Sequence, residues 1–61
     1  MIRIILEPPV VPHKVARATG KKTYRHGDDA YCIDVRTIGE LDTTTALLEK
    51  AGIKIEKTED I

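Results

Sequence analysis

Apolar residues recur at every second position near the start of the chain and again near its middle. Residues 2–6 and residues 30–37 both follow this pattern, with isoleucine, leucine, valine or tyrosine on one face. Because strand side chains alternate between two faces, each stretch predicts a strand with one apolar face. Residues 21–25 precede the second stretch across a glycine-containing turn, which predicts a β-hairpin. A last strand is expected at residues 53–56, with residues 57–61 frayed.

Three prolines follow the first predicted strand. Pro8, Pro9 and Pro12 predict an extended connector, because proline fixes φ and lacks an N–H donor. From residue 13 to residue 18 polar and apolar side chains alternate again, and Val15 is the only large apolar residue among them. This pattern predicts a weak strand that is exposed on one side.

One helix is predicted after the hairpin. Thr37 and Glu40 have the spacing of a capping box, in which a hydroxyl and a carboxylate accept bonds from backbone N–H groups at the helix start. An alternative start lies at Asp42. Gly52 is expected to end the helix, with Ile53 packing back onto it. The helix face expected to be buried comprises Leu41, Thr44 or Thr45, Leu48, and Ala51 or Gly52.

These elements predict an α+β fold in which one helix packs on one face of a small, mainly antiparallel sheet of three to four strands. A length of 61 residues allows a single small domain over residues 1–61. A domain of this size buries only about 60% of the surface of its unfolded chain, which leaves little room for a large enzyme cleft. The residues expected to be buried together are Ile4, Ile33, Val35, Leu48 and Ile53.

The net charge of zero conceals two halves of opposite sign. Residues 1–26 carry six Lys or Arg and one acid, a net charge of +5, whereas residues 27–61 carry four Lys or Arg and nine acids, a net charge of −5. The positive charge is concentrated in residues 13–26, which contain no acid. A basic segment with an aromatic residue is typical of a surface that meets a polyanion or an acidic protein. The candidate partner-binding residues are Lys14, Arg17, Lys21, Lys22, Tyr24 and Arg25.

Several kinds of chemistry are disfavoured by the residues present. The chain contains no Ser, Asn or Gln, which excludes a serine nucleophile and amide side chains that read bases. His13, His26 and Cys32 lack the paired spacing of zinc ligands, so no metal and no other cofactor is expected. A catalytic pair of Cys32 with His26 would need a cleft that so small a sheet does not offer. No catalytic residues are therefore assigned, and an enzyme is not expected.

The cellular setting follows from two further features. The single Cys32 cannot form a disulfide within the chain, which favours a reducing compartment and therefore the cytoplasm. The apolar run at residues 2–6 is too short to cross a membrane, so no membrane partner is expected.

Three functions are compatible with this pattern, and the first is favoured. It is a small regulatory protein of inhibitor type that docks on a larger protein through the basic hairpin and a sheet edge. The hairpin–helix–strand order over about residues 21–58 resembles the architecture of small phage-encoded inhibitors of host enzymes, which implies the same kind of role. The alternative is a nucleic-acid-binding protein that uses residues 13–26 as a basic β-ribbon. The third is a module that forms homodimers or larger homo-oligomers.

Overall fold

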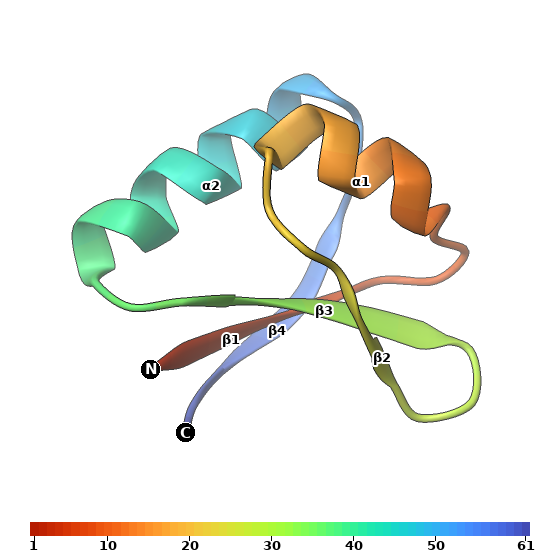
Figure 1. Cartoon of the computed structure of the whole chain (residues 1–61), viewed down its shortest axis with the longest axis horizontal. Coiled ribbons are helices and arrows are strands. Elements are labelled where there is room, and N and C mark those ends of the chain that lie inside the picture. Colours follow the sequence, from red (N-terminus) through yellow and green to blue (C-terminus); the bar gives the residue numbers. More distant parts are fainter.

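Four strands form one antiparallel sheet, and two helices cover one of its faces (Figure 1). The computed structural model describes all residues of the chain, 1–61. The elements are β1 (Ile2–Leu6), α1 (Pro12–Thr19), β2 (Tyr24–His26), β3 (Ala30–Val35), α2 (Ile38–Lys50) and β4 (Ile55–Asp60). The predicted α+β class, with its small antiparallel sheet and a helix on one face, is confirmed, and the structure adds a second helix.

The strands lie in the order β2-β3-β1-β4, so β1 and β3 are central and β2 and β4 are the two edges. Each helix connects two strands that are separated by a third, which is the split β-α-β, or ferredoxin-like, topology. The predicted hairpin is confirmed by the antiparallel pairing of β2 with β3. This topology places the basic middle of the sequence and its acidic end at opposite edges of the sheet.

The core lies between the two central strands and the helices. Ile4 stands opposite Ile33 on the sheet face that the helices cover, and both are fully buried. Val15 of α1 and Leu48 of α2 pack onto them, together with Leu6 and Val35. The predicted grouping of Ile4, Ile33, Val35 and Leu48 is confirmed, and Ile53 is partly buried against the same cluster.

Helix α1 replaces the weak strand predicted for residues 13–18. Pro12 occupies the first turn, where its missing N–H has no helical partner to lose. Gly20 ends the helix with a φ of 69°, in the left-handed region that glycine adopts at little cost, and donates its N–H to the Ala16 carbonyl at 2.7 Å. The prediction of a strand was wrong because one apolar residue, Val15, is compatible with either period. The proline and glycine at the two ends were the better signal.

Helix α2 begins as its capping residues predict. The Glu40 N–H donates to the Thr37 hydroxyl at 3.1 Å, which confirms the start at Thr37 and not at Asp42. The Glu40 carboxylate accepts from the N–H of Arg36 at 2.6 Å, one residue before the position that a capping box uses. Both bonds satisfy backbone donors at the junction of β3 and α2.

The end of α2 is also as predicted. The Gly52 N–H donates to Glu49 at 3.0 Å and the Ile53 N–H donates to Leu48 at 2.9 Å, the two bonds of a Schellman motif. Gly52 has a φ of 76°, in the left-handed region. Ile53 then packs against the core cluster to which Leu48 belongs.

Strand β4 lies later in the chain than its apolar residues suggest. The expected strand was 53–56 with a frayed end, whereas the structure pairs Ile55–Asp60 with β1. The prediction of fraying at residues 57–61 was wrong because β1 needs a hydrogen-bonded neighbour on its second side. The backbone of Lys57–Asp60 provides that neighbour whatever the polarity of its side chains.

Candidate functional site

The six candidate partner-binding residues fall into three places. Lys14 and Arg17 lie exposed on α1, Lys21 and Lys22 lie in the connection to β2, and Tyr24 and Arg25 lie on β2. The continuous basic β-ribbon expected for residues 13–26 is therefore wrong, because the first half of that segment is helical.

Three of the six residues line a hollow of about 280 Å³ at the β2 edge of the sheet. They are Lys21, Lys22 and Tyr24. The chain end before β1, the strand β3 and its end, and the first turn of α2 complete the lining with Met1, Asp34, Arg36 and Glu40. The hollow thus gathers residues from three separate stretches of the sequence: the chain end, residues 21–24 and residues 34–40.

Lys21 is held within the protein by a short ion pair. Its ammonium lies 2.6 Å from the Glu40 carboxylate and fastens the connection after α1 to the start of α2. The hydrogen bond from Lys21, followed by the bond from the Arg36 backbone, lowers the pKa of Glu40 below its usual range. Lys21 and Glu40 neutralise each other, so Lys21 anchors the hollow and is not free to bind a partner's carboxylate.

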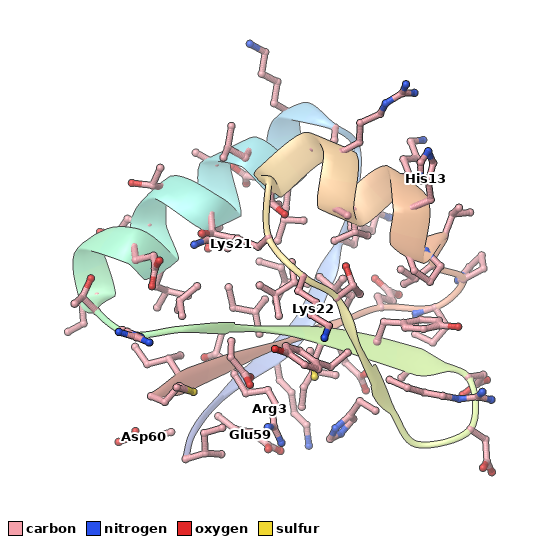
Figure 2. The ribbon with its side chains drawn as sticks, viewed as in Figure 1. Arg3, His13, Lys21, Lys22, Glu59 and Asp60 are labelled. Atoms are coloured by element: carbon pink, nitrogen blue, oxygen red, sulfur yellow. The ribbon has the colours of Figure 1, made fainter.

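Asp34 is neutralised in a similar way on the helix-free face of the sheet. The Arg3 Nε donates to one Asp34 oxygen at 3.0 Å, and a terminal guanidinium nitrogen approaches the other at 3.4 Å. The hydrogen bond from Arg3 to Asp34 raises the pKa of the guanidinium, which therefore stays charged. Figure 2 shows Arg3 on the side of the sheet away from the helices.

Two cations of the hollow have no carboxylate partner. Lys22 and Arg36 are exposed, and neither forms an ion pair with Asp34 or Glu40. The two acids in the lining are already engaged by Arg3 and Lys21. The hollow therefore presents a net positive surface.

Tyr24 gives the hollow an aromatic wall. It stands opposite Cys32 and so lies on the helix-free face, where 45% of its surface is exposed. The Lys22 ammonium is 5.5 Å from the centre of its ring, close enough for a cation–π contact worth about 0.5–1 kcal/mol at an exposed site. Lys22 and Tyr24 are consequently held next to each other at the rim.

Arg25 turns away from the hollow. Its guanidinium donates to the backbone carbonyls of Gly27 at 3.3 Å and Asp28 at 2.6 Å, within the turn that joins β2 to β3. These bonds stabilise the hairpin turn and leave Arg25 less available to a partner than its charge alone suggests.

Arg36 was missed among the candidates because it belongs to the acidic half of the sequence. A signal was nevertheless present: alternation places Arg36 on the same face as Cys32 and Asp34. The predicted hairpin brings that face beside Tyr24. Charge counted by strand face, and not by sequence half, would have found this residue.

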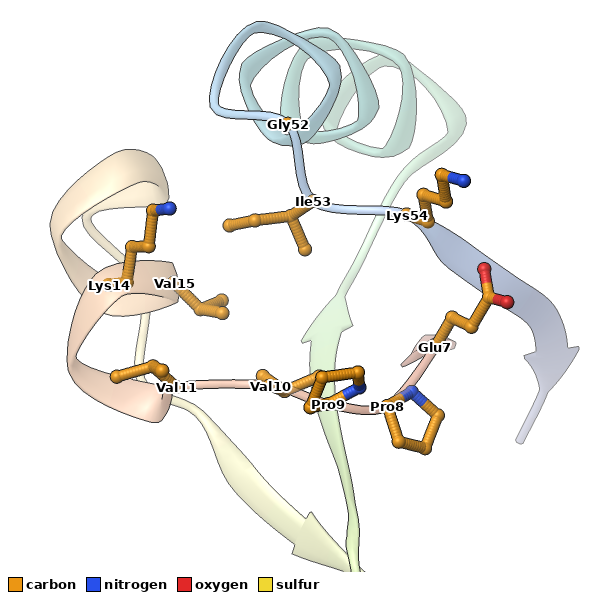
Figure 3. Close-up of a pocket in the computed structure, with 10 residues that line it drawn as sticks. All are labelled: Glu7, Pro8, Pro9, Val10, Val11, Lys14, Val15, Gly52, Ile53 and Lys54. Carbon is orange, nitrogen blue, oxygen red and sulfur yellow. The ribbon is translucent and has the colours of Figure 1, made fainter.

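A second hollow, of about 360 Å³, lies between α1 and the chain that leads into β4 (Figure 3). Val15 and Ile53 point into the same space, with Lys14 on one side and Glu7 and Lys54 together on the other. Since an acid accompanies the two cations, the charges of this groove single out no class of ligand.

The side chains considered for metal binding and catalysis lie on three different elements: His13 on α1, His26 on β2 and Cys32 on β3. No group of three or more His, Cys, Asp or Glu side chains gathers as metal ligands. Cys32 is 1% exposed, and burial raises the pKa of its thiol, so the thiol is protonated at neutral pH. Neither helix combines the length and the apolar character that a membrane-spanning segment requires.

Comparison with known proteins adds no assignment: no family model, no curated protein and no solved structure matches the chain. The resemblance in element order to phage-encoded inhibitors therefore transfers no residue roles. What the protein does must be inferred from its surface.

Proposed function

We propose that this chain is a small, non-enzymatic regulatory protein that docks on a larger protein by receiving an acidic segment of it in the hollow at the β2 edge. The observation that carries the proposal is the surplus of positive charge there. Lys22 and Arg36 lack a carboxylate partner, while both acids of the lining are already paired. A carboxylate of the partner protein would pair with these two cations.

The composition of the hollow fits a protein partner. Tyrosine and arginine are enriched where protein interfaces carry most of their binding energy, because each combines a large contact area with a polar group. Tyr24 offers that area beside Lys22, and Arg36 offers a planar donor pair suited to a carboxylate. Lys21 and Glu40 brace the hollow from the helix side.

The arrangement of the remaining cations favours a protein over a nucleic acid. Lys14 and Arg17 lie on α1 and Arg25 is bonded into its own turn, so the basic residues do not form one track for a phosphate backbone. Lys22 lies over the Tyr24 ring, where a stacked base would have to displace it.

A cytoplasmic, non-catalytic role is in keeping with the thiol. Cys32 is unpaired, as is usual in reducing compartments, and its burial makes it a poor nucleophile.

The test uses two charge-reversing double variants that differ only in location. Lys22→Glu with Arg36→Glu changes the hollow, and Lys14→Glu with Arg17→Glu makes the same change in charge on α1. Lys21 is left intact because its reversal would also break the contact with Glu40. Each protein is immobilised and exposed to a lysate of its source, with and without nuclease treatment, and bound protein is eluted with polyglutamate.

We expect the wild type and the α1 variant to retain the same partner, and the hollow variant to bind it at least about tenfold more weakly, mainly through slower association. Material that disappears on nuclease treatment would instead support binding to nucleic acid. Loss in the α1 variant with retention in the hollow variant would show that the hollow is not the docking site.

A further inference from the structure

The outer edge of β4 is the longest unpaired stretch of backbone in the sheet. β4 has six residues and pairs only with β1, and no element lies beyond it in the strand order. The opposite edge, β2, has three residues. An unpaired edge strand is a template for a further strand unless something blocks it.

The hydrogen bonds at the chain ends show which groups of β4 face outward. The Ile61 N–H donates to the Met1 carbonyl at 2.9 Å and the Met1 ammonium donates back to Ile61 at 3.3 Å. In an antiparallel ladder such bonded pairs alternate with pairs that do not bond to each other. Counting along the register, Thr58 and Asp60 belong to the second kind, so their N–H and C=O groups point away from β1.

The side chains around this edge are mainly acidic. Glu56, Glu59 and Asp60 accompany a single cation, Lys57, whose ammonium lies 3.2 Å from Glu59. The strand carries a net charge of −2, and Figure 2 shows Glu59 and Asp60 near the end of the sheet where the chain terminates. Glu56 has no partner on β1, because the register shifts between Ile5 and Leu6.

The charge of the edge selects its occupant. Two antiparallel copies of β4 paired about Thr58 would set Glu56 of each copy against Asp60 of the other, and like charges opposite each other destabilise strand pairs. The same register sets Lys57 against Glu59, but these two groups are already paired within each strand. A strand that carries lysine or arginine would instead meet the unpaired carboxylates of Glu56 and Asp60. Because of the bulge at Glu56, the regularly paired part of β4 is Lys57–Asp60. An extended segment of a few residues is therefore long enough to pair with this part of the edge.

We propose that the outer edge of β4 receives an extended basic segment of another protein as a fifth strand of the sheet. The outward N–H and C=O groups of Thr58 and Asp60 supply the backbone hydrogen bonds, and Glu56 and Asp60, which form no ion pair within the protein, supply the preference for basic side chains. This edge lies on the far side of the sheet from the hollow and carries the opposite charge, so the two surfaces accept different partners.

The test follows the backbone amides of the full chain by NMR as a blocked hexapeptide of alternating lysine and valine is added at low salt. We expect saturable shifts at Thr58 and Asp60, with hydrogen exchange of these two amides slowed severalfold. A hexapeptide of alternating glutamate and valine should leave both amides unchanged. Equal responses to the two peptides, or shifts without slowed exchange, would overturn strand addition.

Two sets of variants separate strand pairing from simple attraction. Thr58→Pro removes an outward N–H but no bond to β1, and it should abolish the slowed exchange at Asp60. Glu56→Lys with Asp60→Lys should weaken the basic peptide at least about tenfold, whereas Asp42→Lys with Glu49→Lys, the same change on α2, should have little effect. Equal weakening by both charge variants would overturn the proposal.

Analytical ultracentrifugation of the chain alone tests whether a second copy of the chain occupies this edge instead. We expect a monomer whose mass does not change with concentration. A dimer that forms with rising concentration and is lost in Thr58→Pro would show that the edge holds a second copy, and would overturn the proposal.

Discussion

The two edges of the sheet differ in charge, in length and in how their charged groups are used. At the β2 edge two basic residues are engaged within the protein, Lys21 with Glu40 and Arg25 with its own turn, whereas Lys22 and Arg36 have no carboxylate partner. At the β4 edge the acids are mostly free, and the only ion pair joins the neighbours Lys57 and Glu59. The basic edge is an anchored hollow, whereas the acidic edge is an open strand.

This difference shows how a charge asymmetry along a sequence becomes an asymmetry in space. The strand order β2-β3-β1-β4 sends the basic segment that follows α1 to one edge and the acidic end of the chain to the other. The central strands lie between them and keep the two charges apart. A net charge of zero therefore describes neither edge.

The largest expected effect is a loss of stability of the core, on which both edges of the sheet depend. Leu48 is fully buried in the core that supports both edges, so Leu48→Ala should lower the free energy of unfolding by about 2–5 kcal/mol. Denaturant unfolding measures this change. Leu47→Ala is the control, because Leu47 is 37% exposed and should cost far less. Similar losses in both variants would show that the buried face of α2 is misassigned.

The glycines that end the two helices direct the chain into the two edges of the sheet, so substitutions there test both edges. Gly20 turns the chain toward the β2 edge and Gly52 turns it toward β4, both with positive φ. Alanine at either position should cost about 1–2 kcal/mol in thermal or denaturant unfolding, because a Cβ disfavours the left-handed region. Gly39→Ala, within α2, should instead stabilise by about 0.5–1 kcal/mol, because its added Cβ meets only Thr37 Oγ1 at 3.9 Å. The same sign at all three positions would contradict this.

The anchoring of the basic edge should appear in the dependence of stability on pH. The lowered pKa of Glu40 means that the folded protein favours its ionised form. Glu40 therefore contributes stability above its unfolded pKa of about 4.3, and this is lost as the pH falls through the lower folded value. Unfolding measured at a series of acidic pH values should show a steeper loss for the wild type than for Glu40→Gln. Parallel curves would mean that Glu40 does not anchor the edge.

The smallest effect is expected at the acidic edge. Lys57 is exposed, Glu59 is only partly buried, and both lie on the same strand, so Lys57→Ala should change the free energy of unfolding by no more than about 0.5 kcal/mol. A loss as large as that expected for Gly20→Ala or Gly52→Ala would show that this ion pair stabilises β4. It would remove the contrast between an anchored basic edge and an open acidic edge.

Much of this protein could be predicted from local patterns alone. The alternation in β1 and β3, the Thr37 cap and the Gly52 end of α2 all depend on residues within a few positions of each other. Such signals act through backbone geometry and nearest-neighbour hydrogen bonds, which a sequence states directly. They were enough to define the α+β class and most of the core.

The rest was decided by contacts between distant segments. The core decides which face of α1 is buried, through Val15, and Lys57–Asp60 are extended because β1 needs a second neighbour. The candidate site has the same origin: Arg36 reaches the hollow through the pairing of β3 with β2, and the charge of Lys21 in its lining is neutralised by Glu40. Which charges are free is a property of their partners in space, and the tertiary structure alone determines those partners.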